Sequence, residues 1–352
     1  MAIITTHPFG TDKNGNMVNC YSIINKNGAS VTLSSLGASV VSIKVPDKNG
    51  VMTDVVLGYD TLEGYEKGTE YFGATVGRCS GRIKKGSFSL NRKKYSLPIN
   101  NGNNHLHGGF DSFSRKMWDI KMDRGDVVFT LLSPDGDEGY PGEMKVTVRY
   151  TFDDNNVLTI KYSAISDQDT ICNLTNHSYF NLNGHNTASI DDTLLSINAS
   201  KFIELNNELI PTGKILDTEN TPFDFANKKS LSEALKEDHP QLTTAKGFDH
   251  SFISPKGKNI LSFMASATGL KSGITLDCYS TQPILHLYTA NYVDTDNGKN
   301  RACYKNYSGF CMEAQGYPDA VNQKAFPSTI LKANTEYKQT TKFAFSVFDK
   351  ED

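Results

Sequence analysis

Alternation of apolar and polar residues with a period of two restricts the fold of this chain more than any other feature of its sequence. In residues 145–152 every second residue is valine, tyrosine or phenylalanine, and lysine, threonine or arginine stands between them. An extended strand points successive side chains to opposite faces, so this pattern predicts a strand with one buried and one exposed face. Further strand candidates, rich in β-branched and aromatic residues, are residues 39–46, 157–165, 273–280, 284–292 and 341–348.

Short strands separated by turn signals recur along the whole chain. Residues 86–97 are typical of a hairpin that turns near Asn91 and Arg92. The predicted class is therefore all-β, a large antiparallel β-sandwich with few short helices. No Pro/Ser-rich linker divides the sequence, so we expect residues 1–352 to form a single domain.

Helix signals are few. The best covers residues 230–239, where Ser230 and Glu233 form a capping box and Pro240 is expected to end the helix. A short helical turn is also expected at residues 62–67.

Composition excludes several classes of protein. The formal net charge is −3, from 36 basic and 39 acidic residues without strong blocks, so no nucleic-acid or membrane-surface partner is expected. No apolar run is long enough to span a bilayer, and the N-terminus lacks a signal peptide. The six cysteines are widely scattered, with no CxxC pair. We expect a cytoplasmic protein that is a monomer or a homodimer.

Five segments carry polar side chains among small or apolar neighbours. They are residues 71–83 with Arg78 and Arg82, 100–109 with His105 and His107, 173–184 with His177, 246–252 with Asp249, and 309–322 with Glu313. Glu313 is the strongest functional candidate, because a carboxylate in an apolar strand is costly unless it is paired or used. Structural alternatives stay open for the others: Arg82 as a surface charge, His177 as a structural histidine and Asp249 as a turn former.

The two histidines of the HLH segment allow a metal interpretation. On a strand His105 and His107 would point to one face, which suits a metal ion. A third ligand is not recognisable, because the sequence has neither HExxH nor CxxC. GxGxxG, Walker and GxSxG motifs are also missing, which argues against nucleotide cofactors and serine hydrolysis. We expect neither a cofactor nor a metal.

Taken together, the five segments resemble the aldose 1-epimerase family, the galactose mutarotases. The resemblance runs from about Tyr21 to Phe348 and rests on these motifs in the family's order: GATVGR followed by GRI, NHLHGG, TNHSYFNL, GFDH, TQP and EAQGYPDAVN. It implies a β-sandwich with a sugar site in a cleft on one face. It also implies interconversion of the α and β anomers of free aldohexoses such as galactose and glucose, without a cofactor.

The resemblance also assigns roles to individual residues. It implies that Glu313 is the catalytic base, that His177 is the catalytic acid and that His107 lies near the reacting end of the sugar. Arg82 and Asp249 match residues that bind sugar hydroxyls.

Two positions depart from the family pattern. Gly81 stands where many members have asparagine, and His286, counted here as substrate-binding, stands where some members have glutamine. Both departures affect the expected substrate preference more than the reaction type.

Mutarotation needs one base and one acid, because the C1 hydroxyl loses a proton while the ring oxygen gains one. Three alternatives remain: an epimerase of hexose phosphates, a non-catalytic sugar-binding protein on the same fold, and a glycoside hydrolase or lyase. The first would need more cationic residues, and the second would not need an acid and a base together. Hydrolases typically use two carboxylates.

Overall fold

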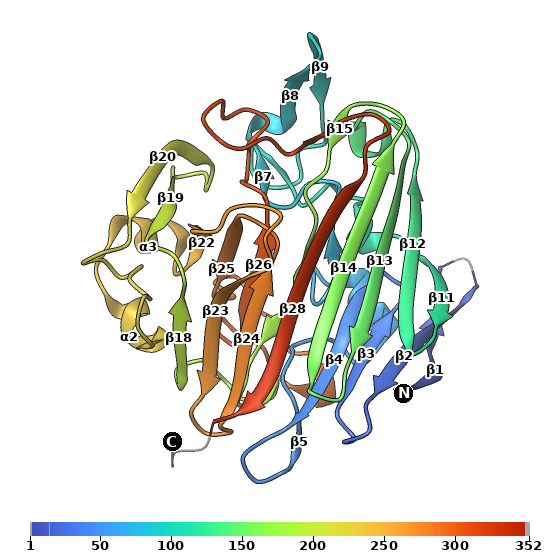
Figure 1. Cartoon of the computed structure of the whole chain (residues 1–352), viewed down its shortest axis with the longest axis vertical. Coiled ribbons are helices and arrows are strands. Elements are labelled where there is room, and N and C mark those ends of the chain that lie inside the picture. Colours follow the sequence, from blue (N-terminus) through green and yellow to red (C-terminus); the bar gives the residue numbers. More distant parts are fainter. Residues whose placement is uncertain (1, 14, 349–352) are drawn as a thin grey trace.

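The computed structural model describes residues 2–13 and 15–348 and is built mainly from antiparallel strands (Figure 1). Its largest sheet has nine strands. In sheet order they are β11 (Asp119–Asp123), β12 (Asp126–Ser133), β13 (Met144–Phe152), β14 (Val157–Ser166), β28 (Tyr337–Val347), β24 (Ile274–Ser280), β23 (Ser262–Gly269), β18 (Thr193–Ile197) and β21 (Lys229–Ser230).

Strand β13 shows why the periodic segments become strands of this sheet. Every second side chain is buried, and the residues between them are half-buried or exposed. The buried residues are Met144, Val146, Val148, Tyr150 and Phe152. β13 pairs along its length with β14, where Val148 stands opposite Tyr162. The apolar face of the period-two pattern is therefore the core face, as predicted.

Two further sheets face this one. The five-stranded sheet contains β1 (Ile3–Thr11), β2 (Met17–Ile24), β3 (Ser30–Ser34), β4 (Ser39–Pro46) and β5 (Met52–Asp54). The six-stranded sheet contains, in order, β17 (Tyr179–Phe180), β26 (Phe310–Gln315), β25 (Ile284–Tyr288), β22 (Asp249–Ile253), β19 (Lys201–Leu205) and β20 (Pro211–Asp217).

Four two-stranded pairs complete the strands. They are β10 (His105–Leu106) with β7 (Arg82–Ile83), β15 (Thr170–Ile171) with β27 (Ile330–Leu331), β16 (Thr175–Asn176) with β6 (Thr75–Val76), and β8 (Ser87–Leu90) with β9 (Lys93–Ser96). The last pair is the predicted hairpin, whose turn falls at Asn91 and Arg92 with positive φ at both residues.

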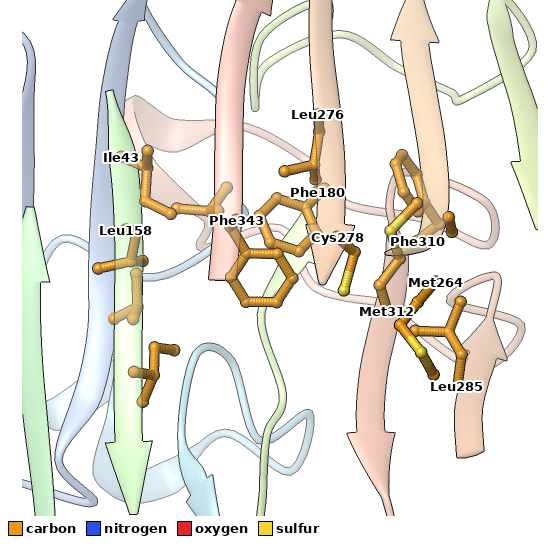
Figure 2. Packing of buried hydrophobic residues seen from close by; sticks show 14 of the residues in the cluster. Ile43, Leu158, Phe180, Met264, Leu276, Cys278, Leu285, Phe310, Met312 and Phe343 are labelled. Carbon is orange, nitrogen blue, oxygen red and sulfur yellow. The ribbon is translucent and has the colours of Figure 1, made fainter. Parts of the chain in front are cut away.

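The three large sheets meet in one hydrophobic core (Figure 2). The nine-stranded sheet contributes Leu158, Leu276 and Phe343 to this core. The six-stranded sheet contributes Leu285 and Met312, and the five-stranded sheet contributes Ile43. The predicted all-β class is thereby confirmed, as a large antiparallel β-sandwich with few short helices.

The α-helices are α1 (Leu62–Lys67), α2 (Leu231–Lys236) and α3 (Pro240–Ala245); single 3₁₀ turns lie at Lys84–Gly86, Phe113–Arg115, Asp137–Gly139 and Lys299–Arg301. The Ser230 hydroxyl accepts a hydrogen bond from the Glu233 amide, so the predicted cap of α2 is confirmed. The expected helix to His239 is wrong, because α2 ends at Lys236 and Pro240 begins α3. Proline is well suited to a first helical position. Among the described helices, none has the length and apolar content that crossing a bilayer requires.

Candidate active site

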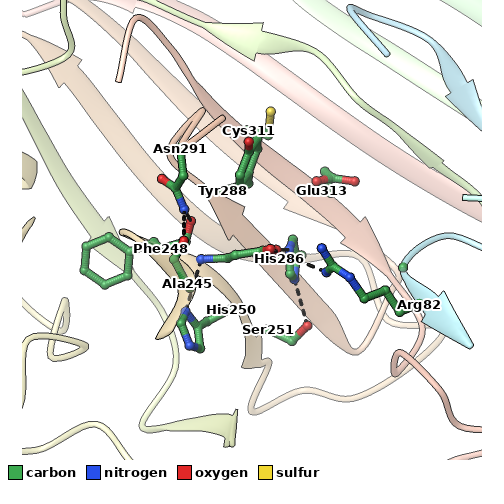
Figure 3. A network of polar contacts seen from close by, with 12 residues as sticks. Arg82, Ala245, Phe248, His250, Ser251, His286, Tyr288, Asn291, Cys311 and Glu313 are labelled. Carbon is green, nitrogen blue, oxygen red and sulfur yellow. Dashed lines mark hydrogen bonds and ion pairs between the residues drawn. The ribbon is translucent and has the colours of Figure 1, made fainter. Parts of the chain in front are cut away.

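The floor of the candidate site is one face of the six-stranded sheet. Strands β22, β25 and β26 are neighbours, and their register aligns Ser251, His286 and Glu313 in one row. Asp249, Tyr288 and Cys311 form the next row. Residues two apart on a strand share a face, so both rows lie on the same side of the sheet (Figure 3). The residues between these rows on β25 and β26, Leu287 and Met312, face the core.

This face forms the base of a cavity of about 400 Å³. The six residues that the resemblance assigned to catalysis or sugar binding all line it: Arg82, His107, His177, Asp249, His286 and Glu313. Three of them come from the two-stranded pairs that lie against the sheet. Arg82 opens β7, His107 follows β10, and His177 follows β16. Arg82 and Glu313, which are 231 residues apart in the chain, thus meet at one cavity.

His177 and Glu313 form a close pair at this cavity. The Nε2 atom of His177 lies 3.5 Å from Oε1 of Glu313, and both side chains are almost fully buried. The second carboxylate oxygen, Oε2, is buried and has no hydrogen-bond partner among the described residues. A buried carboxylate oxygen is stabilised only when a donor reaches it, so this atom can receive a proton or a hydrogen bond from a bound molecule.

The ring of His177 is held on three sides. It stacks against Tyr179, with ring centroids 4.9 Å apart, and against Tyr71, at 6.0 Å. The Sγ atom of Cys311 lies 3.5 Å from Nδ1. Burial lowers the pKa of His177, and the negative charge of Glu313 opposes that shift.

A second polar network crosses the floor of the cavity (Figure 3). Nη1 of Arg82 lies 3.4 Å from Oδ2 of Asp249, whose Oδ1 is 2.8 Å from Nε2 of His286. The Nδ1 atom of His286 lies 2.9 Å from the Ser251 hydroxyl oxygen. The Nε–H group of Arg82 also donates to Asn101 Oδ1, at 3.1 Å. Arg82 is therefore an anchored cavity residue, and the surface-charge interpretation is wrong.

The charged groups of this network shift one another's pKa values. Burial opposes ionisation of Asp249, but Arg82 and His286 outweigh it and hold the pKa of this carboxyl well below its usual range. Burial also disfavours a charged His286, yet the hydrogen bond and charge of Asp249 raise its pKa above the ordinary value. The cavity floor thus holds an ionised carboxylate between the Arg82 guanidinium and an imidazole whose protonated form is favoured by that carboxylate.

His107 is bound to the backbone of Gly81. The Gly81 amide donates to Nδ1 of His107 at 3.3 Å, and the His107 amide donates to the Gly81 carbonyl at 3.2 Å. Nδ1 is therefore the acceptor, and in the neutral ring Nε2 carries the proton. Burial, helped by the charge of His177, lowers the pKa of His107 well below its usual value. His107 is thus a neutral hydrogen-bond donor.

The expectation that His105 and His107 share a face is wrong. Strand β10 ends at Leu106, and His107 has a φ of 52°, which breaks the alternation. His105 turns instead into a separate packing cluster, where its Nδ1 atom lies 2.7 Å from the Pro98 carbonyl oxygen and its Nε2 atom 2.8 Å from the Tyr140 hydroxyl. The HLH pair does not form a bidentate metal site.

One group of described residues has metal-ligating atoms close together: His177, Cys311 and Glu313 lie within 4.8 Å. The sulfur approaches Nδ1 of His177, whereas the carboxylate approaches Nε2. One ion can bind only one of these nitrogens. Burial also raises the pKa of the Cys311 thiol well above its usual value, so a thiolate ligand is disfavoured. The arrangement suits proton transfer better than metal coordination.

Several cavity residues were not identified from the sequence. Among them are Tyr71, Tyr179, Ser251, Tyr288 and Gln315, which line the cavity, and Cys311, which contacts His177. The available signal was the strand pattern around Glu313. In β26, cysteine, glutamate and glutamine alternate with phenylalanine, methionine and alanine, and every residue is buried. Cys311 and Gln315 are each two residues from Glu313, so on a strand they share its face and are expected at the same site.

The comparisons with known proteins agree with this geometry. The family model described as aldose 1-epimerase matches residues 19–344, which is most of the chain. The chain belongs to the aldose 1-epimerase family. This match includes every segment that contributes to the cavity.

Curated relatives of the aldose 1-epimerase family cover nearly the same length. The galactose mutarotase of Bos taurus is 45% identical over 318 residues, which cover 90% of this chain and 91% of that protein. The aldose 1-epimerase of Haemophilus influenzae is 36% identical over 326 residues, covering 91% of this chain and 94% of that protein.

Solved structures of the aldose 1-epimerase family have the same fold. An aldose epimerase homologue from C. elegans superposes with a TM-score of 0.88 at 31% identity, covering 94% of this chain and 100% of that one. A galactose 1-epimerase from Lactobacillus acidophilus gives a TM-score of 0.85 at 27% identity, covering 99% and 100%.

Proposed function

We propose that this aldose 1-epimerase opens and closes the ring of free aldohexoses, galactose and glucose among them, with Glu313 as base and His177 as acid. As a member of its family the chain is an isomerase that interconverts α and β anomers. One observation carries the assignment of roles. A buried carboxylate with an oxygen that has no partner among the described residues lies 3.5 Å from a buried imidazole at the cavity of about 400 Å³.

The reaction needs two coupled proton transfers. Glu313 takes the proton of the C1 hydroxyl while the His177 imidazolium gives a proton to the ring oxygen. The bond between C1 and the ring oxygen breaks, its electron pair stays on that oxygen, and C1 becomes a carbonyl carbon. Rotation about the C1–C2 bond presents the other face of the carbonyl. Closure then reverses both transfers and leaves the protonation states unchanged.

The carboxylate that assists protonation of His177 is the base itself. Burial lowers the pKa of His177, and the Glu313 charge is the largest influence that raises it. Once Glu313 accepts the substrate proton, that support is lost and the imidazolium becomes a stronger acid. The two transfers therefore favour each other.

The remaining residues suit recognition. His107 offers a neutral N–H to the carbonyl oxygen that develops at C1, because its Nδ1 atom already accepts from Gly81. Arg82 and His286 donate, and Asp249 accepts, so this network matches the alternating donors and acceptors of sugar hydroxyls. Arg82 is the only Lys or Arg lining the cavity in the described part of the chain, and Asp249 already pairs with it. This favours neutral sugars over hexose phosphates.

Polarimetry tests the proposal directly. Fresh α-D-glucose or α-D-galactose is dissolved with and without protein, and the relaxation of optical rotation is followed against the spontaneous rate. We expect acceleration of both, and little or none for glucose 6-phosphate. Failure with every free aldose overturns the proposal, whereas acceleration of the phosphate alone supports the hexose-phosphate alternative.

We further propose that the chain acts in the cytoplasm as one domain and as a monomer or homodimer. Support for the compartment comes from its six cysteines, all of which are free thiols. Gel filtration with light scattering tests the oligomeric state.

A further inference from the structure

Gln315 is a buried amide that the acid–base mechanism does not use. It follows Glu313 by two residues on β26, so both side chains lie on the cavity face of the strand. Its Oε1 atom is buried and has no hydrogen-bond partner among the described residues. A buried amide oxygen without a partner destabilises the folded protein, so its retention needs a reason outside folding.

The surroundings of Gln315 direct its amide into the sugar cavity. Gln315, Gly81 and Pro318 all line that cavity. A Cβ atom built on Gly81 would lie 3.9 Å from Nε2 of Gln315 and 3.1 Å from Cβ of Pro318. These two residues therefore form the wall beside the amide, and the opposite strand partner, Ile284, offers no polar side chain.

The order of residues along β26 decides which part of the sugar reaches Gln315. Cys311, Glu313 and Gln315 follow one another on the cavity face, about 7 Å apart. His177 contacts Cys311 through Nδ1 and Glu313 through Nε2, so it lies on the Cys311 side of the base. Gln315 lies on the other side.

We propose that Oε1 of Gln315 accepts a hydrogen bond from the C2 hydroxyl of the sugar. The inference rests on the proposed function, in which C1 lies at Glu313 and the ring oxygen at His177. C1 has two ring neighbours, the ring oxygen and C2. With the ring oxygen toward His177, C2 and its hydroxyl extend toward Gln315. Gln315 is thus a substrate-binding residue that holds C2 while the carbonyl at C1 rotates about the C1–C2 bond.

A cycle of two variants and two sugars tests this. Gln315→Met keeps the length of the side chain but removes both amide atoms. We expect it to lower kcat/KM for glucose about 3- to 10-fold, the range of one neutral hydrogen bond. For 2-deoxyglucose, which lacks the hydroxyl, wild type and Gln315→Met should have equal kcat/KM within about 2-fold.

Gln339 supplies a matched control. It is also buried, but its amide is satisfied within the protein, because Oε1 accepts from the Tyr337 hydroxyl and Nε2 donates to the Ala314 carbonyl. Gln339→Met should lower the melting temperature and leave the ratio of the two sugars at the wild-type value. Gln315→Met should melt at or above the wild-type temperature, because it removes an unpartnered polar atom.

The outcomes separate this inference from the proposed function. Equal losses of kcat/KM with both sugars, or no loss with glucose, overturn the role of Gln315 while the mutarotase activity stands. An inactive wild-type protein overturns the proposed function itself. The inference is supported if Gln315→Met lowers kcat/KM for glucose but not for 2-deoxyglucose, while Gln339→Met keeps the wild-type ratio of the two kcat/KM values.

Discussion

At the scale of single residues, the environment of Glu313 separates function from packing. Among the described residues, the only ion-pair partner of Glu313 is His177, whose Nε2 atom lies 3.5 Å from Oε1. The other carboxylate oxygen, Oε2, has no hydrogen-bond partner among these residues. A carboxylate retained in this condition costs folding free energy. The position of Glu313 is therefore explained by a catalytic role rather than by packing.

Replacing Glu313 with glutamine keeps its size and removes the basic oxygen. We expect Glu313→Gln to lower the mutarotation rate with saturating galactose by about 10²–10⁴-fold, with a melting temperature equal to or above that of wild type. Glu70→Gln is a suitable control, because the Glu70 carboxylate lines the cavity but accepts from the Tyr59 hydroxyl and the Thr69 amide. A folded Glu313→Gln protein that keeps more than about a tenth of wild-type turnover would transfer the role to another carboxylate.

The pH dependence follows from the environment of His177. As the acid it must be protonated, and burial lowers its pKa below the ordinary value. We therefore expect kcat/KM to fall as the pH rises through a value below about 6.5. Removing the Glu313 charge removes the main influence that raises this pKa, so NMR titration should give a lower His177 pKa in Glu313→Gln. An unchanged or higher pKa in the variant would contradict the pairing.

At the scale of secondary-structure elements, β26 explains how a regular strand produces a site. Phe310 and Met312 face the hydrophobic core, and Glu313 and Gln315 face the cavity. The same alternation that predicts a half-exposed strand is present, but the polar face is covered by the segments of Arg82 and His107. The polar side chains are therefore buried together, where electrostatic interactions are stronger than in water.

Helix α2 offers a test at this scale, because it packs next to β18 and its residues do not line the cavity. Ser230→Ala removes the side chain that accepts from the Glu233 amide. We expect a loss of about 1 kcal/mol in the free energy of unfolding, with kcat/KM unchanged. Ser230→Asp should retain most of the stability. Denaturant unfolding and polarimetry measure the two effects, and a large loss of activity in the alanine variant would link α2 to the site.

At the scale of the whole molecule, buried histidines make stability depend on pH. Burial lowers the pKa of His105 to about 4 and that of His250 to about 3. Between about pH 6.5 and 4 the unfolded chain therefore binds more protons than the folded one, and stability falls as the pH falls. His286 does not offset this, because its raised pKa makes its contribution change only above about pH 6.5.

The expected size is about 1.4 kcal/mol per pH unit for each of these two histidines. Urea unfolding at pH 7 and pH 5 should show a lower midpoint at pH 5. His105→Gln should have a smaller difference between the two pH values, even if its stability at pH 7 is reduced. A wild-type protein that is equally stable at both pH values would show that the pKa values of these histidines are not lowered in the folded state.

The sequence by itself determined the strands with clear alternation, such as those at residues 145–152 and 157–165, the hairpin at Asn91, the cap at Ser230 and the residues of the five polar segments. These are local properties, because periodicity and capping depend on residues a few positions apart. Only the tertiary structure decided the rest. It placed Ser251, His286 and Glu313 in one row and turned His105 away from His107. Register between distant strands is fixed by how their apolar faces pack in a shared core, and no local pattern contains that information.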